Sequence, residues 1–69
     1  MRELKNVEIL PDELEAIKLY LVDGLDQTES AKKMDVSQPT FARIINSATK
    51  KLGEAIIKGK AIKINKLED

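Results

Sequence analysis

Apolar residues near the start of the chain recur at the spacing of one helix face. They lie three or four residues apart, at Leu10, Leu14, Ile17 and Leu21. Pro11 suits the first turn of a helix, because the N–H that proline lacks has no partner there. Gly24 suits the left-handed position that follows a helix end. The pattern therefore predicts a helix over residues 11–22 that buries this apolar face.

A second, shorter helix is predicted over residues 27–34. Asp26 is a good N-cap residue, and Glu29 three positions later gives the pattern of a capping box. Because so short a helix is marginal by itself, it has to be stabilised by packing against the rest of the chain.

A third, long helix is predicted over residues 38–58. Ser37 is its predicted N-cap, and Pro39 lies in its first turn. One apolar stripe then runs through more than four turns, at Phe41, Ile44, Ile45, Ala48, Leu52, Ala55 and Ile56. The helix continues until Gly59, and Gly53 inside it permits a close helix contact or a bend.

A turn of only three residues, 35–37, separates the second and third predicted helices. Two helices joined in this way have the anatomy of a helix-turn-helix. Ala31 is small enough to let the two helices cross closely. The wedge between them is filled by four apolar residues: Met34, Val36, Phe41 and Ile44.

Both ends of the chain have short stretches in which polar and apolar residues alternate, over residues 7–9 and 60–64. Alternation is typical of strands, which could pair with each other or across a dimer. The expected fold class is therefore all-α: a three-helix helix-turn-helix domain with a long third helix and short terminal β-strands. Residues 1–69 form one domain, with the helix-turn-helix at about 27–52 and a strand and dimerisation segment at about 53–66.

Charge is distributed unevenly, although the chain is neutral overall with 12 basic and 12 acidic side chains. Residues 1–30 have a net charge of −5, and residues 31–69 have a net charge of +5. A chain polarised in this way can bind a polyanion with its basic half. The alternative interpretation is that the charges simply lie on the solvated surface of ordinary helices.

The outward face of the third helix supplies side chains that suit DNA. Arginine can bind guanine through two hydrogen bonds, asparagine or glutamine can do the same with adenine, and small residues allow close approach. The candidates for base contacts are Gln38, Pro39, Ala42, Arg43 and Asn46. The candidates for contacts to the DNA backbone are Ser37, Thr40, Lys32, Lys33, Lys50 and Lys51. Each of them could also belong to an ordinary solvated helix face or helix cap.

Other classes of function find little support in the composition. The chain has no Cys and no His, so it lacks the usual metal ligands, the usual general base and any disulfide. We expect no enzymatic activity, no cofactor and no metal. The longest apolar runs fall far short of the roughly 20 residues of a membrane helix, so we expect a cytoplasmic protein with no membrane partner.

The chain resembles the small prokaryotic predicted DNA-binding proteins catalogued as domain of unknown function 134. The resemblance rests on four segments in order: DELEA at 12–16, DGLDQ at 23–27, MDVSQPTF at 34–41, and KKL at 50–52 through GK at 59–60. That family looks like a relative of the DNA-binding fourth region of sigma factors. The resemblance implies that residues 28–34 and 38–52 form the helix-turn-helix, with the latter as the recognition helix.

Three positions depart from the family pattern. Asp35 stands where such turns usually carry Gly, so it must accept a left-handed conformation. Ser30 is more polar than expected at a packed position, and Thr49 stands where the family tends to have Arg.

Together these observations predict sequence-specific binding of double-stranded DNA by a transcriptional regulator. We expect a homodimer whose recognition helices lie about one DNA turn, roughly 34 Å, apart on a two-fold site. The expected dimer surface comprises residues 52–57 and the strand at 60–64. The alternative is a protein–protein interaction module that uses a sigma-like helical domain and its acidic first helix.

Overall fold

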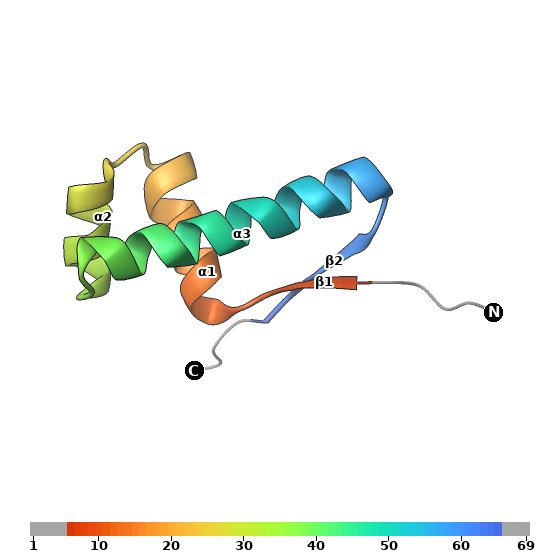
Figure 1. Ribbon diagram of the computed structural model, residues 1–69, viewed down its shortest axis with the longest axis horizontal. Helices are drawn as coiled ribbons and strands as arrows, with labels where there is room; N and C mark the ends of the chain where they lie inside the picture. The colour runs from red at the N-terminus through yellow and green to blue at the C-terminus, as the bar shows by residue number, and fades with distance from the viewer. Residues whose placement is uncertain (1–5, 66–69) are drawn as a thin grey trace.

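The computed structural model describes residues 6–65, and this part of the chain is mostly helical (Figure 1). The first helix begins as α1 (Pro11–Ala16) and continues without a break as the π-helical η1 (Ile17–Val22). The second and third helices are α2 (Gln27–Met34) and α3 (Gln38–Lys58). The three helices predicted from the apolar pattern are thus confirmed with their bounds, whereas the π-helical pitch of η1 was not predicted.

Two short strands, β1 (Asn6–Ile9) and β2 (Ala61–Ile64), pair in parallel within the chain. Parallel strands need a crossover connection, and the three helices together provide it. The two terminal strands therefore pair with each other within one chain, which is one of the two pairings that the sequence left open. The predicted C-terminal segment, 53–66, ends one residue outside the described part of the chain.

The turn between α2 and α3 is built around Asp35, which adopts the left-handed conformation with φ 59°. The N–H of Val36 donates to the carbonyl of Ala31 at 3.0 Å, and the N–H of Asp35 donates to that of Lys32 at 3.0 Å. This pair of bonds is a Schellman motif, in which the last carbonyls of a helix find partners. Asp35 therefore takes the conformation that the sequence requires of it.

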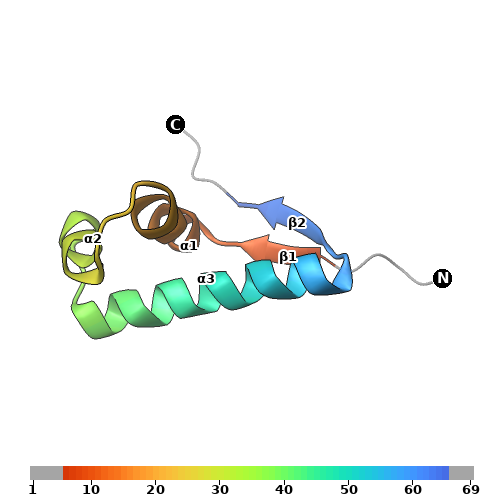
Figure 2. The same ribbon diagram turned by 90° about the horizontal axis from the view of Figure 1, so that it is seen from above.

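Helix α3 spans the length of the molecule and contributes to both parts of the core (Figure 2). Near its N-terminus, Phe41 and Ile45 pack against α1 and α2. Near its C-terminus, Ala55 packs against the buried face of β1. The wedge residues expected between the helices are all in the first cluster: Met34, Val36, Phe41 and Ile44.

The apolar face predicted for the first helix is only partly buried. Leu10 is 40% exposed and Leu21 is 50% exposed. Leu14 and Ile17 pack against the core as predicted, but the most buried positions of the helix are Glu13, Ala16 and Leu19. From Ile17 onward each turn contains more residues, because π-helical bonds join residues five apart, and the spacing of an α-helix no longer keeps residues on one face.

The apolar stripe of α3 also ends earlier than predicted. Ile56 is 74% exposed, because the narrow pair of strands covers only the Ala55 side of this part of the helix. Gly53 is exposed, and a Cβ atom added there would meet nothing within 4 Å. Gly53 therefore makes no close helix contact with the described residues.

Candidate nucleic-acid interface

One face of α3 is buried in the core, and the opposite face presents polar and basic side chains. Pro39, Arg43, Asn46 and Lys50 follow one another at intervals of four, three and four residues, and all are exposed. Ala42 lies among them and is half-buried. The structure therefore brings four of the five predicted base-contacting residues onto one stripe, with Gln38 at its beginning.

Arg43 and Asn46 are the residues of this stripe with the most hydrogen-bonding capacity. Within residues 6–65, neither side chain forms an ion pair or a hydrogen bond with another residue. Their donors and acceptors are thus not engaged by the described part of the protein.

The N-terminus of α3 is organised by its own side chains. Ser37 Oγ accepts the N–H of Thr40 at 3.2 Å and lies 2.9 Å from the Thr40 hydroxyl, to which it donates. Gln38 Nε2 donates to the hydroxyl of Thr28 in α2 at 2.6 Å. The first turn of α3 is therefore held in place against α2, and Gln38 keeps its second N–H and its side-chain oxygen for other partners.

The four candidate lysines divide into two groups. Lys32 and Lys33 in the last turn of α2 are exposed, as is Lys50 on the outer stripe of α3. Lys51 points to the other side of α3, where its Nζ donates to Glu13 Oε1 at 2.8 Å and to the carbonyl of Glu8 at 2.8 Å. Lys51 therefore joins α3 to α1 and β1.

Glu13 is the partner of Lys51 and is only 4% exposed. Its carboxylate also accepts the N–H of Leu10 at 2.9 Å and the Ser47 hydroxyl at 2.7 Å. Burial raises the pKa of Glu13, but the bonds from Leu10, Lys51 and Ser47 outweigh it and hold the pKa below its ordinary value of 4.5. The ion pair of Glu13 and Lys51 thus ties α1, β1 and α3 together.

This network was missed in the sequence, although one signal for it was present. Lys51 lies three residues after Ala48 and four before Ala55, both of which belong to the apolar stripe of α3. A lysine at such a position faces inward and needs an acidic partner. The partner comes from another helix, which spacing along one helix does not reveal.

Two further carboxylates have lysine partners at the surface. The Lys18 ammonium donates to Asp23 at 2.8 Å, and this bond raises the pKa of Lys18. The bond from Lys60 lowers the pKa of Glu54. Exposed pairs of this kind contribute little to stability.

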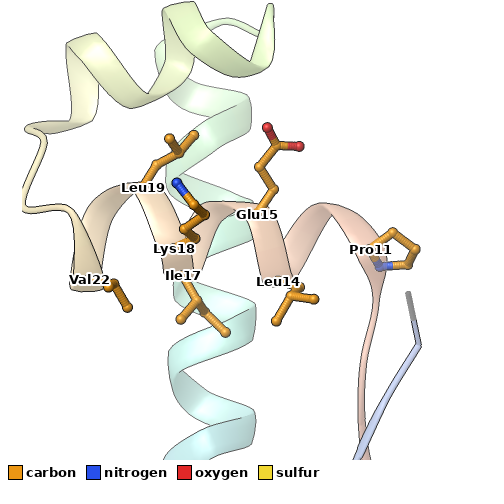
Figure 3. A pocket seen from close by; sticks show the side chains of 7 residues that line it. All are labelled: Pro11, Leu14, Glu15, Ile17, Lys18, Leu19 and Val22. Carbon is orange, nitrogen blue, oxygen red and sulfur yellow. The ribbon is translucent and has the colours of Figure 1, made fainter. Parts of the chain in front are cut away.

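Two shallow grooves flank the first helix. One has a volume of about 530 Å³, and Figure 3 shows Leu14, Ile17 and Val22 on one side of the helix there, with Leu19 directed to the other side. The second has a volume of about 540 Å³ and lies between α1 and the α2–α3 turn. It is lined by Pro11, Asp12, Glu15, Met34, Val36, Thr40 and Ile44. Thr40 thus borders the same groove as the carboxylates of Asp12 and Glu15.

Residues 6–65 contain no group of three or more acidic, histidine or cysteine side chains placed to hold a metal ion. In the same part of the chain, no helix is both long enough and apolar enough to cross a membrane.

Residues 1–68 match the family model described as protein of unknown function DUF134. The chain belongs to the DUF134 family. The resemblance drawn from the four sequence segments is confirmed at the level of the family.

Several curated relatives of this DUF134 chain are named UPF0251 proteins. The chain is 48% identical to one from Moorella thermoacetica over 93% of its own length and 43% of the relative's length. It is 50% identical to one from Thermoanaerobacter pseudethanolicus, over 93% of this chain and 54% of the relative. The chain therefore spans about half the length of these relatives. No solved structure matches it significantly.

Proposed function

We propose that this DUF134 chain binds double-stranded DNA sequence-specifically and acts as a transcriptional regulator. In this proposal α2, the turn at residues 35–37 and α3 form a helix-turn-helix related to region 4 of sigma factors, and α3 is the recognition helix. The observation that carries the proposal is the exposed stripe of Pro39, Arg43, Asn46 and Lys50 along a helix whose other face is firmly packed.

The residues of the stripe have distinct roles in this proposal. Arg43 donates two hydrogen bonds to a guanine edge, and Asn46 pairs with an adenine edge in the major groove. Pro39 and Ala42 are small and allow α3 to approach the bases closely. Gln38 donates one N–H to Thr28, and its second N–H and side-chain oxygen can pair with a base edge.

Contacts to the DNA backbone come from both helices. Lys32 and Lys33 at the end of α2, together with Lys50 on α3, lie outside the core and can reach phosphates. The capped first turn of α3 presents the positive end of its dipole to a phosphate. Lys51 is left out of this set, because Glu13 already holds its ammonium group.

The salt dependence of binding tests the proposal. Affinity for a fluorescently labelled duplex of mixed sequence, measured by anisotropy, should fall linearly on a log–log plot as salt rises. Each phosphate neutralised by a lysine contributes about −0.9 to the slope, so the three lysines Lys32, Lys33 and Lys50 give a slope of about −2.7. Replacing both Lys32 and Lys33 with Gln should make the slope less negative by about two contacts. No binding to duplex, or binding indifferent to salt, would rule the proposal out.

A protein-interaction module is the second candidate function. Its support is the apolar groove along the first helix, where Val22 is 74% exposed beside Leu14 and Ile17 (Figure 3). If this were the function, Val22→Lys would abolish activity in cells and Arg43→Ala would not. The DNA-binding proposal predicts the reverse.

A further inference from the structure

Strand β2 has one free edge. It pairs with β1 along one side, and Figure 2 shows β1 lying between α3 and β2. No described residue pairs with the other side of β2, and all four of its residues are exposed. A parallel sheet of only two strands is marginal, because such sheets are normally larger and covered on both faces.

The main chain of β2 presents its unused hydrogen-bonding groups at this free edge. The N–H of Asn65 donates to the carbonyl of Ile9 at 2.9 Å, so Asn65 directs its main-chain groups toward β1. Successive residues of an extended strand direct these groups to opposite sides. Lys63 therefore faces β1 as Asn65 does, and the N–H and C=O groups of Ile62 and Ile64 face the free edge.

The side chains of Ile62 and Ile64 form half of an unfinished apolar layer. The strand register sets Ile62 beside Val7 and Ile64 beside Ile9, so each pair lies on the same face of the sheet. Val7 and Ile9 are 7% and 1% exposed, whereas Ile62 and Ile64 are 44% and 52% exposed. The layer is thus buried under β1 and open under β2.

We propose that the free edge of β2 binds the β2 strand of a second copy of this chain, with the two strands antiparallel and Ile62 on the two-fold axis. A two-fold axis makes the interface the same on both copies, and antiparallel pairing of identical strands satisfies this condition. Each Ile62 then exchanges both main-chain hydrogen bonds with its counterpart. The result is a continuous four-stranded sheet with the order β1–β2–β2–β1.

Charge selects this register over its neighbour. With Ile62 on the axis, each Lys63 lies opposite Ala61 of the other copy. With Lys63 on the axis, two ammonium groups would face each other, which is unfavourable. Within each copy, Lys63 lies opposite Glu8 in the strand register, and Lys60 is bonded to Glu54.

The helices fit this arrangement. The two α3 helices lie on the same face of the joined sheet, each packed over its own β1. The two β1 strands are three strand spacings apart, about 14 Å. Helices in contact are about 8–10 Å apart, so the space between the two α3 helices is filled by the isoleucines of β2.

Sedimentation equilibrium on the 69-residue chain tests the proposal independently of DNA binding. The expected mass is about twice the 7.7 kDa of one chain. Ile62→Lys should reduce it to one chain while circular dichroism stays helical, because Ile62 is already half exposed. Val22→Lys is the matched control: Val22 is more exposed than Ile62 and lies on η1, away from the strands, so this variant should remain a dimer.

Amide hydrogen exchange identifies the interface itself. In the dimer, the N–H groups of Ile62 and Ile64 should exchange at least ten times more slowly than in Ile62→Lys, where Ile64 reports on the free edge. The protection should weaken on dilution. A monomeric wild type would overturn the proposal, as would a dimer with unprotected Ile62 and Ile64 amides, or one that Val22→Lys dissociates as readily as Ile62→Lys.

Discussion

At the scale of single residues, Ser30 and Ser47 are in contrasting environments. Ser30 is completely buried, and its hydroxyl has no hydrogen-bond partner among the described residues. Ser47 is exposed, yet its hydroxyl donates to the buried carboxylate of Glu13 at 2.7 Å. A buried polar group without a partner is destabilising, whereas a bond to a charged group stabilises.

Substituting these two serines should therefore change stability in opposite directions. Ser30→Ala should raise the free energy of unfolding by about 1 kcal/mol, since it removes an unsatisfied hydroxyl and adds a better helix former. Ser47→Ala should lower it by about 1–2 kcal/mol, because the bond that it removes is made to a charged group. Urea denaturation of both variants measures the effects. A loss of stability in Ser30→Ala would mean that its hydroxyl is bonded in solution.

At the scale of the elements, the two neighbouring lysines of α3 distinguish its faces. Lys50 is exposed on the outer stripe, whereas Lys51 is bonded to Glu13 and to the carbonyl of Glu8. Both were predicted from the sequence to contact the DNA backbone. In the structure, the ammonium group of Lys51 is bonded to the buried Glu13, whereas the side chain of Lys50 is exposed to solvent.

The proposed function predicts different consequences for the two lysines. Lys50→Met should weaken binding to every duplex similarly and make the salt slope less negative by about one contact, with little change in stability. Lys51→Met should instead lower the free energy of unfolding by about 3 kcal/mol or more, because it leaves the Glu13 carboxylate buried without its counter-ion. Anisotropy and urea denaturation together test the pair. The assignment fails if Lys51→Met alters the salt slope and leaves stability unchanged.

The elements that sequence reasoning placed well are those defined by local chemistry. Ser37, Asp26 and Gly59 set helix ends through bonds within a few residues, and such signals can be read directly. The pitch of η1 and the buried position of Glu13 could not be read in this way. The position of Glu13 depends on Ser47 and Lys51 of α3, which lie 34 and 38 residues further along the chain. No capping or spacing signal in the sequence marks the change of helical pitch at Ile17. The exposed stripe of α3 could be predicted, because it consists of the polar residues on the side of the helix opposite its apolar face.

At the scale of the whole molecule, the proposed DNA-binding surface and the pair of strands lie at opposite ends, and both ends contain part of the core. The proposed DNA-reading turns of α3 lie beside α2, and the strands lie at the other end of α3 (Figure 1). The Glu13 network lies between them and joins α1, β1 and α3. The stability of the molecule should therefore depend on the charge of this one carboxylate.

Acid should weaken the protein through Glu13. Because the folded state lowers the pKa of Glu13, the charged carboxylate stabilises the fold at pH values above the ordinary value of 4.5. This contribution is lost as the pH falls through the lower folded-state value. Urea unfolding from about pH 7 to about pH 3 should show a decline in the wild type that is smaller in Glu13→Gln. Equal declines in both proteins would contradict this role.

The proposed dimer also bears on the DNA site. The 21 residues of α3 span about 31 Å. In the dimer, the N-terminal halves of the two α3 helices, which carry the proposed base contacts, point away from the paired β2 strands. Their separation should therefore be nearer two DNA turns, about 68 Å, than the one turn expected from the sequence. The spacing of half-sites in a bound sequence measures this separation.

Selection of bound sequences from random double-stranded DNA, with Arg43→Ala treated in parallel, tests the central claim most directly. The account predicts that the wild type enriches a defined motif, and that Arg43→Ala binds it more weakly by about 1–3 kcal/mol and loses the preference at one base pair. An absence of enrichment in the wild type, or the same motif enriched equally by Arg43→Ala, would contradict base recognition by this face of α3.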